Sequence, residues 1–240
     1  MADPHDWSYR AIREKYALRQ FYWRAYQAFA DTLASTPPKG RALELGAGEG
    51  FARELMPDWL TSDVSHHPGL SLIADATRLP FRDRSLRLIA LLNVLHHIPD
   101  VWAFFAEAER CLLPGGRIKI VDQHLGVISY PILRFMHDEP FDVNVDDLRF
   151  ASKDPEKDAN GAMAWLLFQR DKALFDARFP SLEVVEYLPH TPLMYWLSGG
   201  LKRWSLVGRR LYPLTNAIDR GLARLSPLFC SFCDIEIVKR

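Results

Sequence analysis

The sequence lacks the features that mark several protein classes. Only three cysteines occur among its 240 residues (Cys111, Cys230 and Cys233), too few for a disulfide framework. No apolar run reaches the roughly 18 residues that a membrane-spanning helix needs. The residues before Tyr16 contain no apolar signal-peptide core. These absences predict a cytoplasmic protein and leave open a peripheral attachment to the inner face of the membrane.

An excess of either charge is also missing. Lys plus Arg and Asp plus Glu number 30 each, so the formal net charge is zero. Domains dedicated to nucleic acids are usually basic, so no nucleic-acid partner is expected. Apolar residues make up 48% of the chain, which is normal for a globular protein, and the length suits one large domain.

A metal centre is not predicted either. Cys230 and Cys233 have the spacing of metal ligands, but no second Cys/His pair accompanies them. We interpret both as small apolar residues of a strand.

Short apolar segments alternate with helical patterns through the first half of the chain. The segment at 85–93 is nearly all apolar, as a strand buried on both faces should be. The alternation predicts an α/β fold with a doubly wound, mostly parallel, seven-stranded sheet. Strands are expected at residues 41–45, 59–64, 70–77, 85–93, 117–122, 181–188 and 230–238.

The first residues of the chain have a helical pattern of their own. Residues 6–34 place apolar and aromatic side chains on one stripe, which predicts a single long helix. We expect this helix to flank or cover the domain. Direct contact between its aromatic residues and a substrate is the less favoured alternative.

The stretch LELGAGEG at residues 43–50 carries three glycines. A phosphate-binding Walker loop needs a lysine that is absent here, and Glu49 would repel a phosphate. The dinucleotide fingerprint, aligned on Gly46 and Gly48, would put Phe51 where its third glycine belongs. Both readings are therefore disfavoured.

The pattern Glu44-x-Gly46-x-Gly48-x-Gly50 resembles motif I of the class I S-adenosylmethionine-dependent methyltransferases. Three later segments, ADATRLPF, NVLHHIPD and AERCLLPGGRIKIVD, follow in the order in which that family has similar signatures. The resemblance is closest to the type 11 group and covers residues 40–125. It implies a Rossmann-like methyltransferase fold and S-adenosylmethionine as the cofactor.

Several residues acquire expected roles from this resemblance. Asp63 ends the second strand, where a carboxylate can accept hydrogen bonds from both ribose hydroxyls. Asp75 corresponds to the acid that binds the adenine amino group, and Asn93 should lie near the methionine end. Of His96 and His97, one is expected to flank the cofactor and the other to pack. The expected cofactor-binding residues are Glu44, Gly46, Ala47, Gly48, Asp63, Val64, Asp75, Ala76, Asn93 and His97.

Methyl transfer to oxygen or nitrogen can need a base, and histidines are the natural candidates. His124 follows the predicted strand at 117–122, at the edge where open α/β sheets bind ligands. His137 follows the next helical segment, beside Asp138 and Glu139. We predict His124 first and His137 second as catalytic residues.

Residues 192–226 replace what is usually a short connection between the last two strands. Six Lys/Arg and one acid lie between Leu201 and Ser226, interleaved with apolar side chains. Such a segment suits a membrane interface, here through residues 195–226, and an amphiphilic substrate. A helical cap or a dimer surface with solvated basic residues is the alternative.

The leading hypothesis is a methyltransferase that acts on a small-molecule acceptor or on one linked to a lipid or glycan. A non-catalytic S-adenosylmethionine-binding sensor or complex subunit is the alternative, and an NAD-dependent oxidoreductase is less favoured. The acceptor and the oligomeric state stay open. Within one domain at 1–240, the expected parts are an N-terminal flank (1–38), a cofactor-binding core (39–125), a substrate-side region (126–190), a basic amphipathic insert (191–228) and a last strand (229–240).

Overall fold

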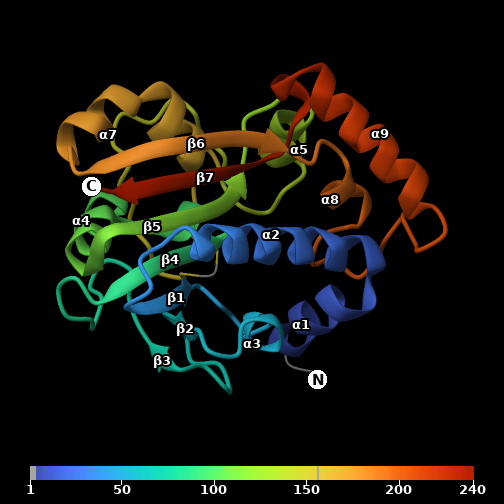
Figure 1. Cartoon of the computed structure of the whole chain (residues 1–240). Coiled ribbons are helices and arrows are strands. Elements are labelled where there is room, and N and C mark those ends of the chain that lie inside the picture. The colour runs from blue at the N-terminus through green and yellow to red at the C-terminus, as the bar shows by residue number, and fades with distance from the viewer. Residues whose placement is uncertain (1–3, 156) are drawn as a thin grey trace.

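Seven strands form one sheet in the order β3-β2-β1-β4-β5-β7-β6 (Figure 1). The structure is a computed structural model that describes residues 4–155 and 157–240; residues 1–3 of the predicted flank and Glu156 of the substrate-side region lie outside the described residues. The strands are β1 (Arg41–Leu45), β2 (Leu60–Asp63), β3 (Leu72–Ile73), β4 (Leu86–Leu92), β5 (Leu112–Gln123), β6 (Leu182–His190) and β7 (Phe232–Lys239).

The strand directions confirm the predicted sheet. The first five strands pair in parallel, and β7 lies antiparallel between β5 and β6. Parallel strands need crossovers, so helices cover both faces of the sheet. The helices are α1 (Pro4–Glu14), α2 (Tyr16–Ala34), α3 (Ala52–Leu55), the 3-10 helix η1 (Leu95–His97), α4 (Val101–Cys111), α5 (Ser129–Phe135), α6 (Met163–Trp165), the π-helical turn η2 (Leu166–Arg170), α7 (Lys172–Arg178), α8 (Met194–Leu197), α9 (Tyr212–Leu225) and the 3-10 helix η3 (Pro227–Phe229).

Strand β4 explains why one apolar run serves two cores. Its side chains alternate between the faces of the sheet. Leu88 packs on one face in a cluster that contains Phe21 and Phe29 of α2. Ile89 packs on the other face in a cluster that contains Phe105 of α4. Burial on both faces therefore requires the nearly unbroken apolar sequence of this strand.

The N-terminal segment differs from the prediction of one helix over residues 6–34. Two helices meet at Lys15, whose backbone is extended, with φ −86° and ψ 107°. The Lys15 ammonium group donates to the carbonyls of Gly200 and Lys202 in the insert. Contact with a distant segment thus fixes the corner, and α1 turns toward α3 while α2 runs along the sheet (Figure 1).

Other expected elements are present but shorter. The helical segment after the glycine turn is the single turn of α3, and the third strand has only two residues. The insert before the last strand contains α8 and α9, as the predicted helical insert requires. Among the described residues, no helix combines the length and the apolar character that crossing a bilayer demands.

Candidate active site

A cavity of about 250 Å³ lies at the carboxyl ends of β1, β4 and β5. Its walls come from the glycine turn after β1, from the residues after β4, and from the end of β5. Its remaining lining comes from α1, α2, α8, Leu201, the first residue of β7 (Phe232) and the loop that carries His137 and Glu139. The volume is just below the roughly 300–1,000 Å³ of typical small-molecule sites.

The N-terminal segment and the insert cover this cavity together. The indole nitrogen of Trp7 donates to the carbonyl of Leu201 at 2.7 Å, and the Arg203 guanidinium lies 5.6 Å from the centre of the Trp7 ring. Tyr9 of α1 and Tyr22 of α2 line the cavity. The first two helices therefore both cover the site and contribute aromatic side chains to it.

Positive φ angles favour glycine in the turn after β1. Gly46 has φ +68° and Gly48 has φ +50°, values that favour glycine. A Cβ at Gly46 would lie 2.2 Å from Cγ2 of Val94, so this glycine allows close packing. A Cβ at Gly48 would meet nothing within 4 Å, so the backbone there is open to a ligand.

Asp63 holds the glycine turn from the neighbouring strand. Its Oδ2 accepts from the Gly48 N–H at 2.9 Å, and its Oδ1 accepts from the Ser65 N–H at 3.0 Å. An ionised carboxylate has about four acceptor positions, so Asp63 keeps capacity for ribose hydroxyls.

Asp75 is exposed and forms a local turn. Its Oδ1 accepts from both the backbone N–H and the hydroxyl of Thr77, each at 2.8 Å. Four predicted cofactor residues do not line the cavity, whereas the other six do. The cavity thus encloses only part of the expected cofactor site. The four are Asp63, Val64, Asp75 and Ala76.

Buried oxygens without hydrogen-bond partners surround the cavity. Each such oxygen lowers the stability of the folded state by roughly 1–3 kcal/mol unless a ligand or an ion binds to it. All of them are acceptors, so the cavity favours a donor or a cation. S-adenosylmethionine carries a cationic sulfonium and an ammonium group, and the residues present fit it. The unpartnered atoms of the cavity lining are Glu44 Oε2, Asn93 Oδ1, Gln123 Oε1 and Glu139 Oε2.

Glu44 lies at the floor of the site, on β1. The Tyr26 hydroxyl donates to its Oε1 at 2.8 Å. Burial raises the pKa of Glu44 to about 7; the hydrogen bond from Tyr26 opposes this rise, and the charge of Asp63 adds to it. Glu44 is therefore close to half-protonated at neutral pH in the ligand-free protein.

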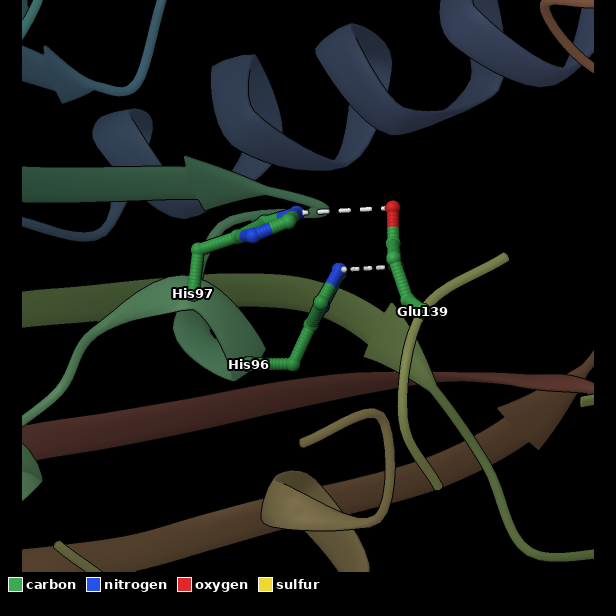
Figure 2. Close-up of side chains that lie close together, drawn as sticks. All are labelled: His96, His97 and Glu139. Carbon is green, nitrogen blue, oxygen red and sulfur yellow. Dashed lines mark ion pairs between the residues drawn. The ribbon is translucent and has the colours of Figure 1, made fainter. Parts of the chain in front are cut away.

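Glu139 lies among three histidines. Its Oε2 is 3.3 Å from His96 Nε2 and 3.7 Å from His137 Nδ1, and its Oε1 is 3.7 Å from His97 Nε2. Figure 2 shows His96 and His97 directed toward the same carboxylate. On its other side, His96 Nδ1 lies 2.5 Å from Oδ1 of the buried Asp122.

The charges of this cluster follow from its contacts. Although burial lowers it, the charges of Asp122 and Glu139 raise the pKa of His96 to about 10. Burial and the neighbouring His96 lower the pKa of His97 to about 4. His97 Nδ1 lies 3.2 Å from the carbonyl of Asp158, which can only accept, so Nδ1 carries the proton. The lone pair of Nε2 consequently faces the cavity.

The two predicted catalytic histidines lie in different surroundings. His137 lines the cavity, whereas His124 does not. His124 Nδ1 lies 2.9 Å from the Tyr187 hydroxyl, and burial lowers the pKa of His124 to about 4. Cys230 and Cys233 are buried free thiols, and burial raises the pKa of each.

Sequence reasoning missed part of the site. It expected His96 or His97 only to flank and pack, and it did not connect them with Glu139. The adjacent histidines after β4 were the available signal, but their partner lies more than forty residues away in the chain. The tyrosines from the first two helices were also outside the expected set.

Comparisons with known proteins agree with this arrangement. Residues 43–120 match the family model Methyltransf_11, described as a methyltransferase domain. A demethylmenaquinone methyltransferase of Roseiflexus castenholzii (strain DSM 13941 / HLO8) is 33% identical over 132 residues, which cover 48% of this chain and 55% of the relative. The 27-O-demethylrifamycin SV methyltransferase of Amycolatopsis mediterranei (strain S699) is 45% identical over 49 residues, 20% of this chain and 18% of the relative. The chain thus spans at most about half the length of these curated relatives.

A solved structure shares the fold over nearly the whole chain. The geranyl diphosphate C-methyltransferase of Streptomyces coelicolor A3(2) superposes with a TM-score of 0.53 at 16% identity. The match covers 97% of this chain and 84% of the other. The likeness therefore extends beyond the matched family segment into the helices that cover the cavity.

Proposed function

We propose that this chain methylates a small-molecule acceptor inside the cavity. At residues 43–120 it carries a domain of the type 11 group of class I S-adenosylmethionine-dependent methyltransferases. The proposal rests on one observation: the glycine turn and several buried oxygens without hydrogen-bond partners line the same cavity. Glu44 and Asn93 supply two of these acceptors.

Different residues of the chain suit different parts of the methyl donor. When bound, S-adenosylmethionine supplies an activated methyl group on its sulfonium. Gly48 offers an open backbone, and Asp63 keeps acceptor capacity for hydroxyl groups beside it. The unpartnered oxygens of Glu44 and Asn93 suit the cationic part of the donor. Such positioning supplies much of the rate in a displacement whose donor is already activated.

The far side of the cavity suits the acceptor. Trp196 and Phe232 provide aromatic walls, and His97 and Glu139 provide groups that can take a proton. Both are weak bases, because the pKa of His97 is about 4 and that of Glu139 about 2. An acceptor with an acidic proton, such as a phenol or an enol, therefore fits this side best.

The outer surface of the insert supports an amphiphilic acceptor at an anionic lipid surface. On α9, Leu214, Ile218 and Leu225 are 64%, 50% and 76% exposed and lie on one stripe. Asp219, the one acid between residues 201 and 226, is buried and accepts from the Leu193 N–H at 2.5 Å. The exposed surface of α9 therefore offers apolar and basic side chains, a combination suited to anionic lipid.

Two alternatives predict different ligands. A sensor or complex subunit would bind S-adenosylmethionine without turnover. A dinucleotide oxidoreductase would bind NAD instead, but Phe51 is buried at the position of the third fingerprint glycine and packs against Tyr26.

A titration with S-adenosylmethionine, followed by an assay with methyl-labelled cofactor, tests the proposal. Phenolic, enolic and lipid-linked acceptors would be presented with and without anionic vesicles. Labelled product formed by the wild type and lost in Asp63→Ala supports it. Binding without transfer to any acceptor favours the sensor, and binding of NAD in place of S-adenosylmethionine favours the oxidoreductase.

A further inference from the structure

We propose that His96, His97 and Glu139 form a binding site for a divalent transition-metal ion within the cavity. Each residue offers one ligand atom, and these atoms all lie within 4.8 Å of one another. Figure 2 shows the two rings and the carboxylate converging from η1 and from the loop after α5. No metal was predicted from the sequence, because Glu139 joins the histidines only in the fold.

The donor set selects the kind of ion. Two imidazoles with one carboxylate suit zinc and iron(II), whereas magnesium and calcium prefer sites made of oxygen. Three protein ligands leave at least one coordination position for water or a substrate. All three residues line the cavity, so an open position is accessible from within it.

Contacts behind the histidines hold them as metal ligands are usually held. His96 is 2% exposed, and Asp122 Oδ1 fixes its Nδ1 at 2.5 Å. The Asp158 carbonyl accepts from His97 Nδ1 at 3.2 Å. Carboxylates and carbonyls commonly orient ligating histidines in this way and fix which nitrogen is available. In both residues Nε2 is the nitrogen left to bind an ion, and the ion would replace the Nε2 proton of His96.

A separate observation also calls for a cation. Glu139 Oε2 is buried and has no hydrogen-bond partner, although His96 lies 3.3 Å away. Gln123 Oε1, which belongs to the same cavity lining, is likewise unpartnered. The Glu139 N–H donates to His137 Nδ1 at 3.3 Å, which helps to hold this carboxylate toward the other histidines. An ion bound here would take the place of the His96 Nε2 proton and bind directly to an oxygen that now meets His96 only as an ion pair.

An ion at this position has a chemical consequence for the proposed function. His97 and Glu139 would be ligands and could no longer take a proton from the acceptor. A bound divalent ion lowers the pKa of a coordinated hydroxyl, so that water can take its proton. An acceptor oxygen at the open coordination position would thus lose its proton more readily before methyl transfer. This consequence rests on the proposed methyl transfer, whereas binding of the ion does not.

The test is metal binding by the full chain without a histidine tag. Zinc is titrated calorimetrically, and cobalt(II) is followed by its visible absorption, which reports nitrogen and oxygen ligands directly. We expect one ion per chain, with at least tenfold weaker binding in His97→Ala and in Glu139→Gln. His66→Ala is the matched control, because His66 is an exposed histidine outside the cluster, and it should bind as the wild type does.

The outcomes separate the two proposals. Absence of zinc binding, or equal binding by wild type and both cluster variants, overturns the metal site and leaves methyl transfer untouched. Zinc binding by a chain that fails to bind S-adenosylmethionine overturns the proposed function instead. Thermal unfolding verifies that each variant is folded. If His97→Ala does not fold, Glu139→Gln decides the question, because it preserves the size of a side chain that lies on a loop.

Discussion

Glu44 makes the stability of the ligand-free protein depend on pH. Its pKa is about 7 in the folded chain and 4.5 without perturbation. The folded state thus holds this proton more tightly than the unfolded state, and the stability contributed by Glu44 falls as pH rises from 4.5 to 7. At about 1.36 kcal/mol for each pKa unit, ionisation of Glu44 costs up to about 3 kcal/mol above pH 7.

Glu44→Gln removes this cost. Urea unfolding of both proteins at several pH values between 4 and 8 would give the difference in their free energies of unfolding. We expect this difference to move by about 3 kcal/mol in favour of the variant as pH rises. Contributions from other titrating groups are the same in both proteins and cancel in this difference. Any cost of burying the glutamine amide does not change with pH. Glu14→Gln, an exposed carboxylate on α1, is the control. A difference that stays constant with pH for Glu44→Gln would mean that folding does not raise the pKa of Glu44.

Three further predictions follow from the cofactor site and the insert. Asp63→Ala should weaken S-adenosylmethionine binding by roughly 1–3 kcal/mol, because the ribose hydroxyls and the Gly48 N–H lose their acceptor. Calorimetry would measure the change, with Asp58→Ala, at an exposed position, as the control. Gly46→Ala should destabilise the fold because its Cβ would overlap Val94, whereas Gly221→Ala, in open space on α9, should raise the melting temperature. In flotation with anionic vesicles, Leu214→Ser with Ile218→Ser should reduce recovery with lipid, and Leu174→Ser on α7 should not. Equal affinity in Asp63→Ala and wild type would contradict the first prediction, and unchanged melting temperatures in the two glycine variants would contradict the second. Equal recovery of the leucine–isoleucine variant and wild type with lipid would contradict the third.

The central strands were predictable because their signal is local. Strand β4 must be apolar on both faces, and Gly46 and Gly48 must adopt positive φ, so each requirement appears directly in the sequence. The break at Lys15 had no such signal. The carbonyls that hold its ammonium lie in the insert, and an amphipathic stripe continues across the break.

The candidate site shows the same division. The order of motifs indicated the glycine turn and Asp63, which the fold joins by a hydrogen bond. His96 and Glu139 meet only because the loop after α5 returns to η1. Contacts between residues so far apart in the chain depend on packing, which periodicity and spacing do not report.

Direct titration of the ligand-free chain with S-adenosylmethionine, with NAD as the comparison ligand, tests which cofactor the glycine turn holds. We expect one S-adenosylmethionine per chain, binding that weakens in Asp63→Ala, and no binding of NAD. Binding of NAD without binding of S-adenosylmethionine would contradict it.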